Sequence, residues 1–222
     1  MPERRPQISA SLLAADYARL GEEVTLADHA GVDSFHFDMM DGHYVPNLAL
    51  TPDHLSALRA YSQRPFHVHL ELSNPDEILE HFHGLQADLI ITCWDTLTHP
   101  HDTFLHIRSL GAKVGLSFGP NESAEEAIRY FPDLDMVLIL GVSPGYGGQA
   151  MHANTISRIS QARELRDPMV FSPAIAVDGG VNLENAQSLV RGGAEILIIG
   201  TALFKAKQME NFINALKASV ES

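Results

Sequence analysis

The chain has 222 residues, of which 45% are hydrophobic and 19% charged, a balance that is ordinary for a protein with a folded core. Its formal net charge of −13 excludes nucleic acid and anionic lipid surfaces as expected partners, because a negative field repels both. No apolar run reaches membrane-spanning length, and residues 1–7 lack the apolar stretch of a secretory signal. With a single cysteine, Cys93, and so no internal disulfide, we expect a cytoplasmic protein.

Short apolar runs alternate along the chain with longer stretches that carry helix signals. The runs are 8–13, 34–38, 66–70, 89–92, 113–117, 136–140, 174–177 and 196–199. Several are almost continuously apolar, which is typical of parallel strands covered by helices on both faces. Eight such units predict an α/β protein, a (β/α)8 TIM barrel forming a single domain over residues 1–222. A doubly wound open sheet is the alternative, but the turn at 9–15 lacks the glycines of a dinucleotide-binding turn.

Helix starts between the runs are predicted by residue types that cap a helix N-terminus. The candidates are Asp16, Thr51, Asn74, Ser123 and Asn182, and proline follows Thr51 and Asn74. Ser123 has Glu126 three residues further on, which is the spacing of a capping box. The sequence contains no linker and no clear short repeat, so we expect no domain boundary.

Histidine and aspartate residues collect at the ends of three predicted strands. His36 and Asp38 lie two residues apart and therefore share a face, as do His67 and His69, and Asp178 follows the seventh run. Taken singly, each is better explained as a cap, a loop-end residue or a surface histidine than as part of a site. Because the carboxyl ends of barrel strands meet at one mouth, the set together predicts a site. Imidazole and carboxylate groups suit one divalent metal: zinc, iron, manganese or cobalt.

Glycines follow the last three predicted strands. The segment 143–149 holds Gly145, Gly147 and Gly148, while 179–180 is Gly-Gly and 200–201 is Gly-Thr. Glycine allows backbone N–H groups to turn toward an anion, and late loops of such barrels often bind phosphate. None of these loops contains Lys or Arg, so we expect backbone dipoles to hold the phosphate. The alternative is that the glycines only make tight turns.

Six longer motifs connect these features. They are Ser-Leu-Leu-Ala-Ala-Asp at 11–16, His-Phe-Asp-Met-Met-Asp-Gly-His-Tyr-Val-Pro-Asn at 36–47, Val-His-Leu at 68–70, Pro-Gly-Tyr-Gly-Gly-Gln at 144–149, Val-Asp-Gly-Gly at 177–180 and Gly-Thr-Ala-Leu-Phe at 200–204. By these motifs the chain resembles the ribulose-phosphate 3-epimerase family along essentially its full length. The resemblance implies an isomerase of carbohydrate metabolism that interconverts D-ribulose 5-phosphate and D-xylulose 5-phosphate in the pentose phosphate pathway.

The resemblance also implies residue roles. The metal ligands would be His36, Asp38, His69 and Asp178, with Asp38 and Asp178 acting also as the two acid/base residues. The substrate-binding residues would be Ser11, His69, Met40, Gly145, Tyr146, Gly147, Gly148, Asp178, Gly179, Gly180, Gly200 and Thr201. The chemistry agrees, because inversion at carbon 3 is most simply done with one carboxylate on each face and a metal as Lewis acid. A homo-oligomer, dimer or hexamer, is implied as well.

Four positions depart from the usual family pattern. Glu71 and Leu140 stand where the family commonly has methionine, Trp94 lies where it has histidine, and Gly119 where it has asparagine. We expect Trp94 and Gly119 to face the sugar and to shape substrate choice. Allulose 6-phosphate therefore stays open as the substrate, and so does a non-epimerase phosphosugar-binding barrel. A metal-free lyase or decarboxylase is disfavoured because no predicted strand ends in lysine.

Overall fold

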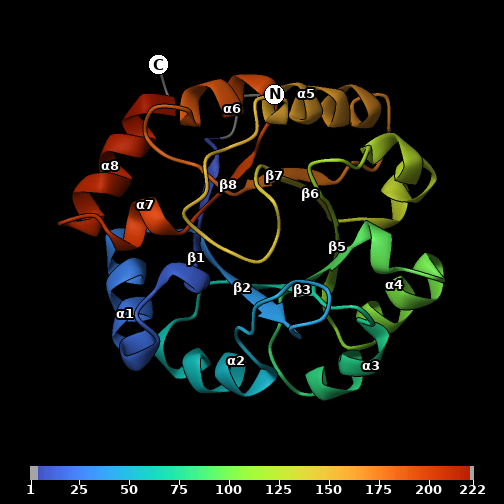
Figure 1. Ribbon diagram of the computed structural model, residues 1–222, viewed down its shortest axis with the longest axis horizontal. Coiled ribbons are helices and arrows are strands. Elements are labelled where there is room, and N and C mark those ends of the chain that lie inside the picture. Colours follow the sequence, from blue (N-terminus) through green and yellow to red (C-terminus); the bar gives the residue numbers. More distant parts are fainter. Residues whose placement is uncertain (1–4, 221–222) are drawn as a thin grey trace.

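The computed structural model describes residues 5–220, and within them eight parallel strands close into a barrel in the order β1 to β8 (Figure 1). The strands are β1 Gln7–Ser11, β2 Ser34–Met40, β3 Phe66–Glu71, β4 Leu89–Cys93, β5 Lys113–Phe118, β6 Met136–Leu140, β7 Ala174–Asp178 and β8 Ile196–Ile199. Pairing of β1 with β8 closes the ring, which confirms the predicted (β/α)8 barrel and excludes the open sheet. The described residues do not include 1–4 or 221–222. The first of these ranges belongs to the segment 1–7, for which the sequence predicts no secretory signal.

Helices form the outer ring around the strands (Figure 1). They are α1 Leu20–Ala30, α2 Pro52–Leu58, α3 Asp76–Leu79, α4 Pro100–Ser109, α5 Thr155–Arg166, α6 Ala186–Gly192, α7 Thr201–Phe204 and α8 Met209–Val220. Between them lie 3-10 helices at Leu12–Ala14, Tyr17–Arg19, Arg59–Tyr61, Glu80–Phe82, Trp94–Thr96 and Ala124–Asp133. Among the helices of residues 5–220, we find none with the length and apolar character that a bilayer crossing requires.

The predicted helix starts are partly confirmed. Pro52 opens α2, and the backbone N–H of Thr51 donates to Nδ1 of His54 at 3.2 Å. Asp16 accepts from the backbone N–H of Ala18 at 3.0 Å, but it caps the short 3-10 helix that precedes α1 rather than α1 itself. The predicted start is therefore right at Thr51, where Pro52 fixes the first turn, and it lies one short turn too early at Asp16.

Three of the predicted starts differ in detail. The Ser123 hydroxyl accepts from Glu125, but the Glu126 carboxylate accepts from Trp94 instead of closing a capping box, so that prediction is wrong. The segment Ala124–Asp133 that follows is 3-10 rather than α-helical and contains a proline. Asn74 donates its amide to Glu77 and caps no helix, and α3 begins after a proline. Asn182 accepts from the backbone N–H groups of Glu184 and Asn185 in the turn that leads directly into α6, so it lies four residues before the helix begins.

The interior of the barrel has two different faces. Strands alternate their side chains, so the residues that do not pack against the helices point into the barrel. From β4 to β8 most of these interior residues form one apolar cluster of Leu89, Ile91, Met136, Leu138, Leu140, Ala176, Ile196 and Ile198, the apolar half, and the buried Ser117 on β5 is a polar exception. On β1 to β3 they are polar yet almost completely buried: Ser9, Ser11, Ser34, His36, Asp38, His67, His69 and Glu71, the polar half.

One arrangement recurs four times at the amino ends of the strands. An acid directly before each even-numbered strand accepts from a backbone N–H of the preceding odd-numbered strand at 2.8–3.0 Å: Asp33 from Ile8, Asp88 from Phe66, Asp135 from Val114 and Glu195 from Ile175. Each acid also pairs with one arginine at 2.8–3.2 Å, namely Arg5, Arg59, Arg108 and Arg166 in the same order. We call each such acid, amide and arginine a strand clasp.

The strand clasps are a repeat of the structure that the sequence alone does not show. It consists of one arginine before each odd-numbered strand and one acid before each even-numbered strand. Intervals between successive clasp residues differ, so the pattern is not a short motif at fixed spacing. The exposed ion pairs add little stability individually. The hydrogen bonds to backbone N–H groups satisfy donors at the start of the odd-numbered strands that the sheet leaves unpaired.

Candidate active site

Four side chains from three strand ends converge at the carboxyl side of the barrel. His36 and Asp38 on β2, His69 on β3 and Asp178 on β7 each offer one ligand atom, and these atoms lie within 4.8 Å of one another. Asp38 is central, because its Oδ1 lies 3.1 Å from Nε2 of His36 and 3.3 Å from Nδ1 of His69. Nε2 of His36 also lies 3.9 Å from Oδ2 of Asp178. The structure thus brings together the whole predicted ligand set.

The two aspartates of this cluster have opposite electrostatics. Burial raises the pKa of Asp38, but the charge of His36 and the hydrogen bonds from His36 and His69 outweigh it and hold that pKa well below its usual range. Burial and the negative charge of Asp38 raise the pKa of Asp178 to about 7. At neutral pH, Asp38 is therefore a carboxylate, while Asp178 is divided between its protonated and ionised forms.

This donor set fits a divalent cation. Two imidazoles and two carboxylates are the ligands that zinc, iron, manganese and cobalt accept. The mutual repulsion that raises the pKa of Asp178 is the repulsion that a cation between the two carboxylates would remove. His36, Asp38 and His69 are at most 2% exposed, so the cluster is shielded from competing water on all sides but that of Asp178.

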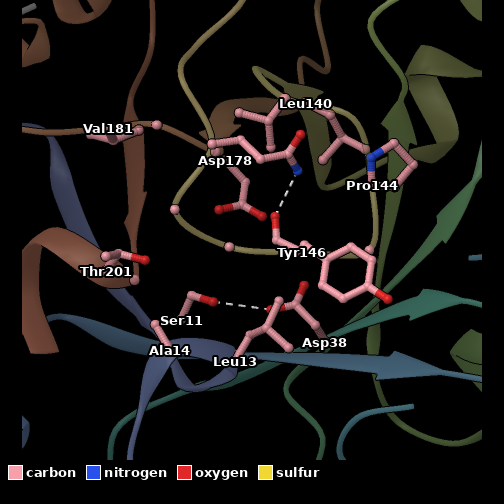
Figure 2. Close-up of a pocket in the computed structure, with 18 of the residues that line it drawn as sticks. Ser11, Leu13, Ala14, Asp38, Leu140, Pro144, Tyr146, Asp178, Val181 and Thr201 are labelled. Atoms are coloured by element: carbon pink, nitrogen blue, oxygen red, sulfur yellow. Dashed lines mark hydrogen bonds between the residues drawn. The ribbon is translucent and has the colours of Figure 1, made fainter. Parts of the chain in front are cut away.

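A cavity of about 250 Å³ opens above the cluster. Asp38 and Asp178 point into it from opposite sides, and the Ser11 hydroxyl donates to Oδ2 of Asp38 at 3.0 Å (Figure 2). The predicted substrate-binding residues that line it are Ser11, Gly145, Tyr146, Gly147, Gly148, Asp178, Gly179, Gly180, Gly200 and Thr201. Two others do not: His69 lies fully buried beneath the cavity, and Met40 pairs with Glu71 in the β2–β3 register.

Close packing of the late loops explains why glycine is needed there. Gly179 has φ +96°, and a Cβ on it would lie 2.5 Å from the Val142 side chain. Gly145 has φ +109° and lies against Val45, where a Cβ would come within 3.1 Å. Any other residue would strain the backbone and push these loops apart. Among the described residues that line the cavity, none is Lys or Arg, so the donors of this side are uncharged: backbone amides, hydroxyls and the side-chain amides of Gln149 and Asn182.

The β2–α2 loop, residues 41–51, crosses the mouth of the barrel and is tied to its far side. The Asn47 amide donates to the Gly145 carbonyl at 2.7 Å, and the Tyr146 hydroxyl donates to the carbonyl of Pro46. At its start, the Asp41 carboxylate accepts from both the backbone and the hydroxyl of Ser73. The loop is therefore fixed to the segments that follow β6 and β3, and sequence spacing alone does not reveal this because the partners are distant in the chain.

Two residues expected to face the sugar do not line the cavity. The Trp94 ring packs near Phe118 and Tyr130, with centroids 6.3 and 6.0 Å away, and its Nε1–H donates to Glu126. Gly119 lies in the turn after β5, where its backbone N–H donates to the carboxylate of Glu122. The prediction for both is wrong, because β4 ends at Cys93 and the 3-10 turn that follows directs Trp94 toward the surrounding helices.

The sequence did not lead us to two neighbours of His69, Ser117 and Cys93. It also gave no role to Glu71, one of the four positions that depart from the family pattern. Ser117 Oγ lies 2.9 Å from Nε2 of His69, and Cys93 Sγ lies 3.6 Å from the same atom. Glu71 lines the cavity although it is only 4% exposed. Burial, followed by the charges of Asp38 and Asp178, raises the pKa of Glu71 to about 9. Alternation along β3, β4 and β5 was the available signal, because it places these three residues on the interior face.

A closed (β/α)8 barrel with an imidazole–carboxylate cluster beneath a glycine-lined cavity defines the class as a barrel enzyme with a candidate metal centre. Residues 7–204 match the model of the ribulose-phosphate 3 epimerase family. The chain belongs to this family of isomerases.

Individual relatives agree with this assignment. The chain is 39% identical to the chloroplastic ribulose-5-phosphate-3-epimerase of Arabidopsis thaliana, over 96% of this chain and 76% of the relative. It is 32% identical to the ribulose-phosphate 3-epimerase of Bacillus subtilis, over 96% and 99%. Among solved structures, the orotidine 5′-phosphate decarboxylase of Pyrococcus horikoshii OT3 aligns over 97% of this chain and 100% of its own with a TM-score of 0.68. At 15% identity this last match shows the fold alone.

Proposed function

We propose that this protein epimerises carbon 3 of a ketose phosphate, converting D-ribulose 5-phosphate to D-xylulose 5-phosphate in the pentose phosphate pathway. One observation carries the proposal: Asp38 and Asp178 face each other across a glycine-lined cavity, so a carboxyl group lies on each side of the space in which a substrate binds (Figure 2). The names of the relatives support the substrate.

The proposed roles of the two aspartates follow from their environments. Asp38, held as a carboxylate by His36 and His69, accepts the proton of carbon 3 through an Oδ atom. Asp178, on the other side of the cavity, carries a proton that it gives to the opposite face of carbon 3. In the reverse direction the two residues exchange roles. Ser11 fixes the carboxylate of Asp38 and lines the same cavity, so its hydroxyl is within reach of the sugar.

The remaining groups bind rather than react. A divalent cation held by His36, Asp38, His69 and Asp178 supplies positive charge that stabilises negative charge developing on the substrate oxygens. The backbone N–H groups of 146–148, 179–180 and 200–201 and the hydroxyl of Thr201 bind the phosphate, whereas the N–H of Gly145 is directed to Glu71. The donor set supports zinc, iron, manganese or cobalt without choosing among them. A cytoplasmic location is supported by the unpaired, buried Cys93, and a homodimer or hexamer by family resemblance.

The test is turnover of two ketose phosphates by metal-reconstituted protein in heavy water, followed by NMR. We expect D-ribulose 5-phosphate to give D-xylulose 5-phosphate with solvent deuterium at carbon 3. Faster turnover of D-allulose 6-phosphate would replace the proposed substrate by that alternative. Binding of both compounds, with neither epimerised nor exchanged, would show a phosphosugar-binding barrel instead.

A further inference from the structure

Glu71 is a buried acid at the end of β3 that the proposed chemistry does not use. Its side chain lines the cavity, yet its Oε2 has no hydrogen-bond partner among the described residues. Its Oε1 lies 3.8 Å from Nδ1 of His69, and the backbone N–H of Gly145 is its other polar neighbour. An unpartnered carboxyl oxygen inside a cavity costs free energy unless a ligand satisfies it.

The position of Glu71 in the barrel indicates which part of a ligand it meets. In the closed ring of eight strands, β3 lies opposite β7, so Glu71 faces the Gly179-Gly180 turn across the mouth. With the phosphate on the late glycine loops and carbon 3 between Asp38 and Asp178, the chain of the sugar continues away from the phosphate toward β3. The group that arrives there is the hydroxymethyl end, carbon 1 and its hydroxyl.

We propose that Glu71 is a specificity residue that hydrogen bonds the carbon 1 hydroxyl of the ketose phosphate. The inference rests on the proposed function and deepens it, because it names the residue that recognises the end of the sugar remote from the phosphate. A carboxylate accepts from this hydroxyl, and a protonated carboxyl donates to it, so the bond forms in either state. Substrates that lack the hydroxyl leave the Glu71 carboxyl unpaired and are rejected.

A role as a metal ligand is less consistent with the geometry. Glu71 is not among the four side chains whose ligand atoms lie within 4.8 Å of one another. Its unpartnered oxygen belongs to a side chain that borders the cavity, whereas His69, its neighbour two residues earlier, is fully buried beneath it. The two roles predict different results when Glu71 is substituted. A specificity residue would lose discrimination between sugars, whereas a metal ligand would lose bound metal.

The experiment compares kcat/KM for D-xylulose 5-phosphate and for 1-deoxy-D-xylulose 5-phosphate, which lacks only the carbon 1 hydroxyl. Wild type is expected to prefer the hydroxylated sugar by about 10- to 100-fold, the range expected when a buried polar group loses its hydrogen-bond partner. Glu71→Met should reduce kcat/KM for D-xylulose 5-phosphate by a similar factor and leave the deoxy sugar within about 3-fold, which removes the preference. Glu71→Gln, which keeps a hydrogen-bonding side chain, should retain most of it.

Bound metal per chain is measured for every variant, and the exposed Glu125→Gln serves as a matched control with unchanged preference. A wild type that turns over both sugars equally would overturn the inference, whether or not Glu71→Met folds. An unchanged preference in Glu71→Met would overturn it as well, and so would loss of metal in both Glu71 variants. If metal-loaded wild type epimerises neither sugar, the proposed function itself fails, which is a separate result from lost discrimination.

Discussion

The polar half and the apolar half of the barrel interior belong to the same ring of strands, but they bury side chains of opposite chemical character. The apolar half, from β4 to β8, fills its share of the interior with branched and straight aliphatic side chains. The polar half, on β1 to β3, buries hydroxyls, imidazoles and carboxyls, and Ser9, Ser34, His36, His67 and Glu71 each leave one side-chain atom without a partner. Buried groups of this kind destabilise a fold. The comparison indicates that stability comes from one half and chemistry from the other, with Asp178 on β7 as the group that joins them.

The largest expected effect comes from removing the cation from the polar half. Exhaustive chelation should reduce epimerisation below detection, since it removes both the stabilising charge and the group that holds the two aspartates together. Adding back one divalent metal per chain should restore it, as followed by metal analysis and a coupled assay. Full activity in metal-free protein would contradict the assignment of the cluster.

Asp38→Asn and Asp178→Asn should each slow epimerisation by about 100- to 10,000-fold, because inversion requires both proton transfers. Each variant that retains its metal should still exchange the carbon 3 proton of one epimer with solvent deuterium, and the two variants should differ in which epimer this is. The exposed Asp53→Asn on α2 is the control and should behave as wild type. Equal loss of exchange and conversion in both variants would indicate a single shared base.

A pair of substitutions measures the contrast in stability directly. Leu138→Ala removes a fully buried side chain from the apolar half and should lower the free energy of unfolding by about 2–5 kcal/mol. Ser34→Ala removes a buried hydroxyl without a partner from the polar half, and should change it by less than about 1 kcal/mol or increase it. Urea denaturation of both variants gives the comparison. A large loss in Ser34→Ala would show that the polar half contains a hydrogen-bonded network after all.

The smallest expected effect concerns the rim above the polar half. Partial burial raises the pKa of Asp41, but hydrogen bonds from Ser73, His43 and Tyr44 outweigh it and hold that pKa well below the usual 3.8. An acid of this kind contributes stability above its unfolded pKa and loses it as pH falls through the lower folded value. Asp41→Asn should therefore cost about 1–2 kcal/mol at pH 7. The difference from wild type should shrink below about pH 4, as measured by denaturation at both pH values. A constant difference would assign the loss to packing.

The fold was predictable because strands buried on both faces are long apolar runs, and most of the predicted runs agree with the strands to within one or two residues. The cluster was predictable because barrel closure brings strand ends together. Contacts that depend on loop conformation were not predictable. The 3-10 turn after Cys93 changes the direction of Trp94, and the path of the β2–α2 loop decides that Asn47 meets Gly145. Local signals also placed the capping box on Glu126, which tertiary structure uses for Trp94 instead.

The strand clasps have a consequence for how this barrel can be divided. Each side-chain clasp joins an odd-numbered strand to the even-numbered strand that follows it, so β1–β2, β3–β4, β5–β6 and β7–β8 form four quarters with equivalent seams. Repeated seams of one design are what duplication of a two-strand ancestor would leave behind. They also mark where new chain termini do least damage: a circular permutant opened between an even-numbered strand and the arginine of the next clasp, as at 97–99 before α4, keeps every clasp within a continuous stretch of the chain. One opened between β3 and β4 separates the two sides of a clasp.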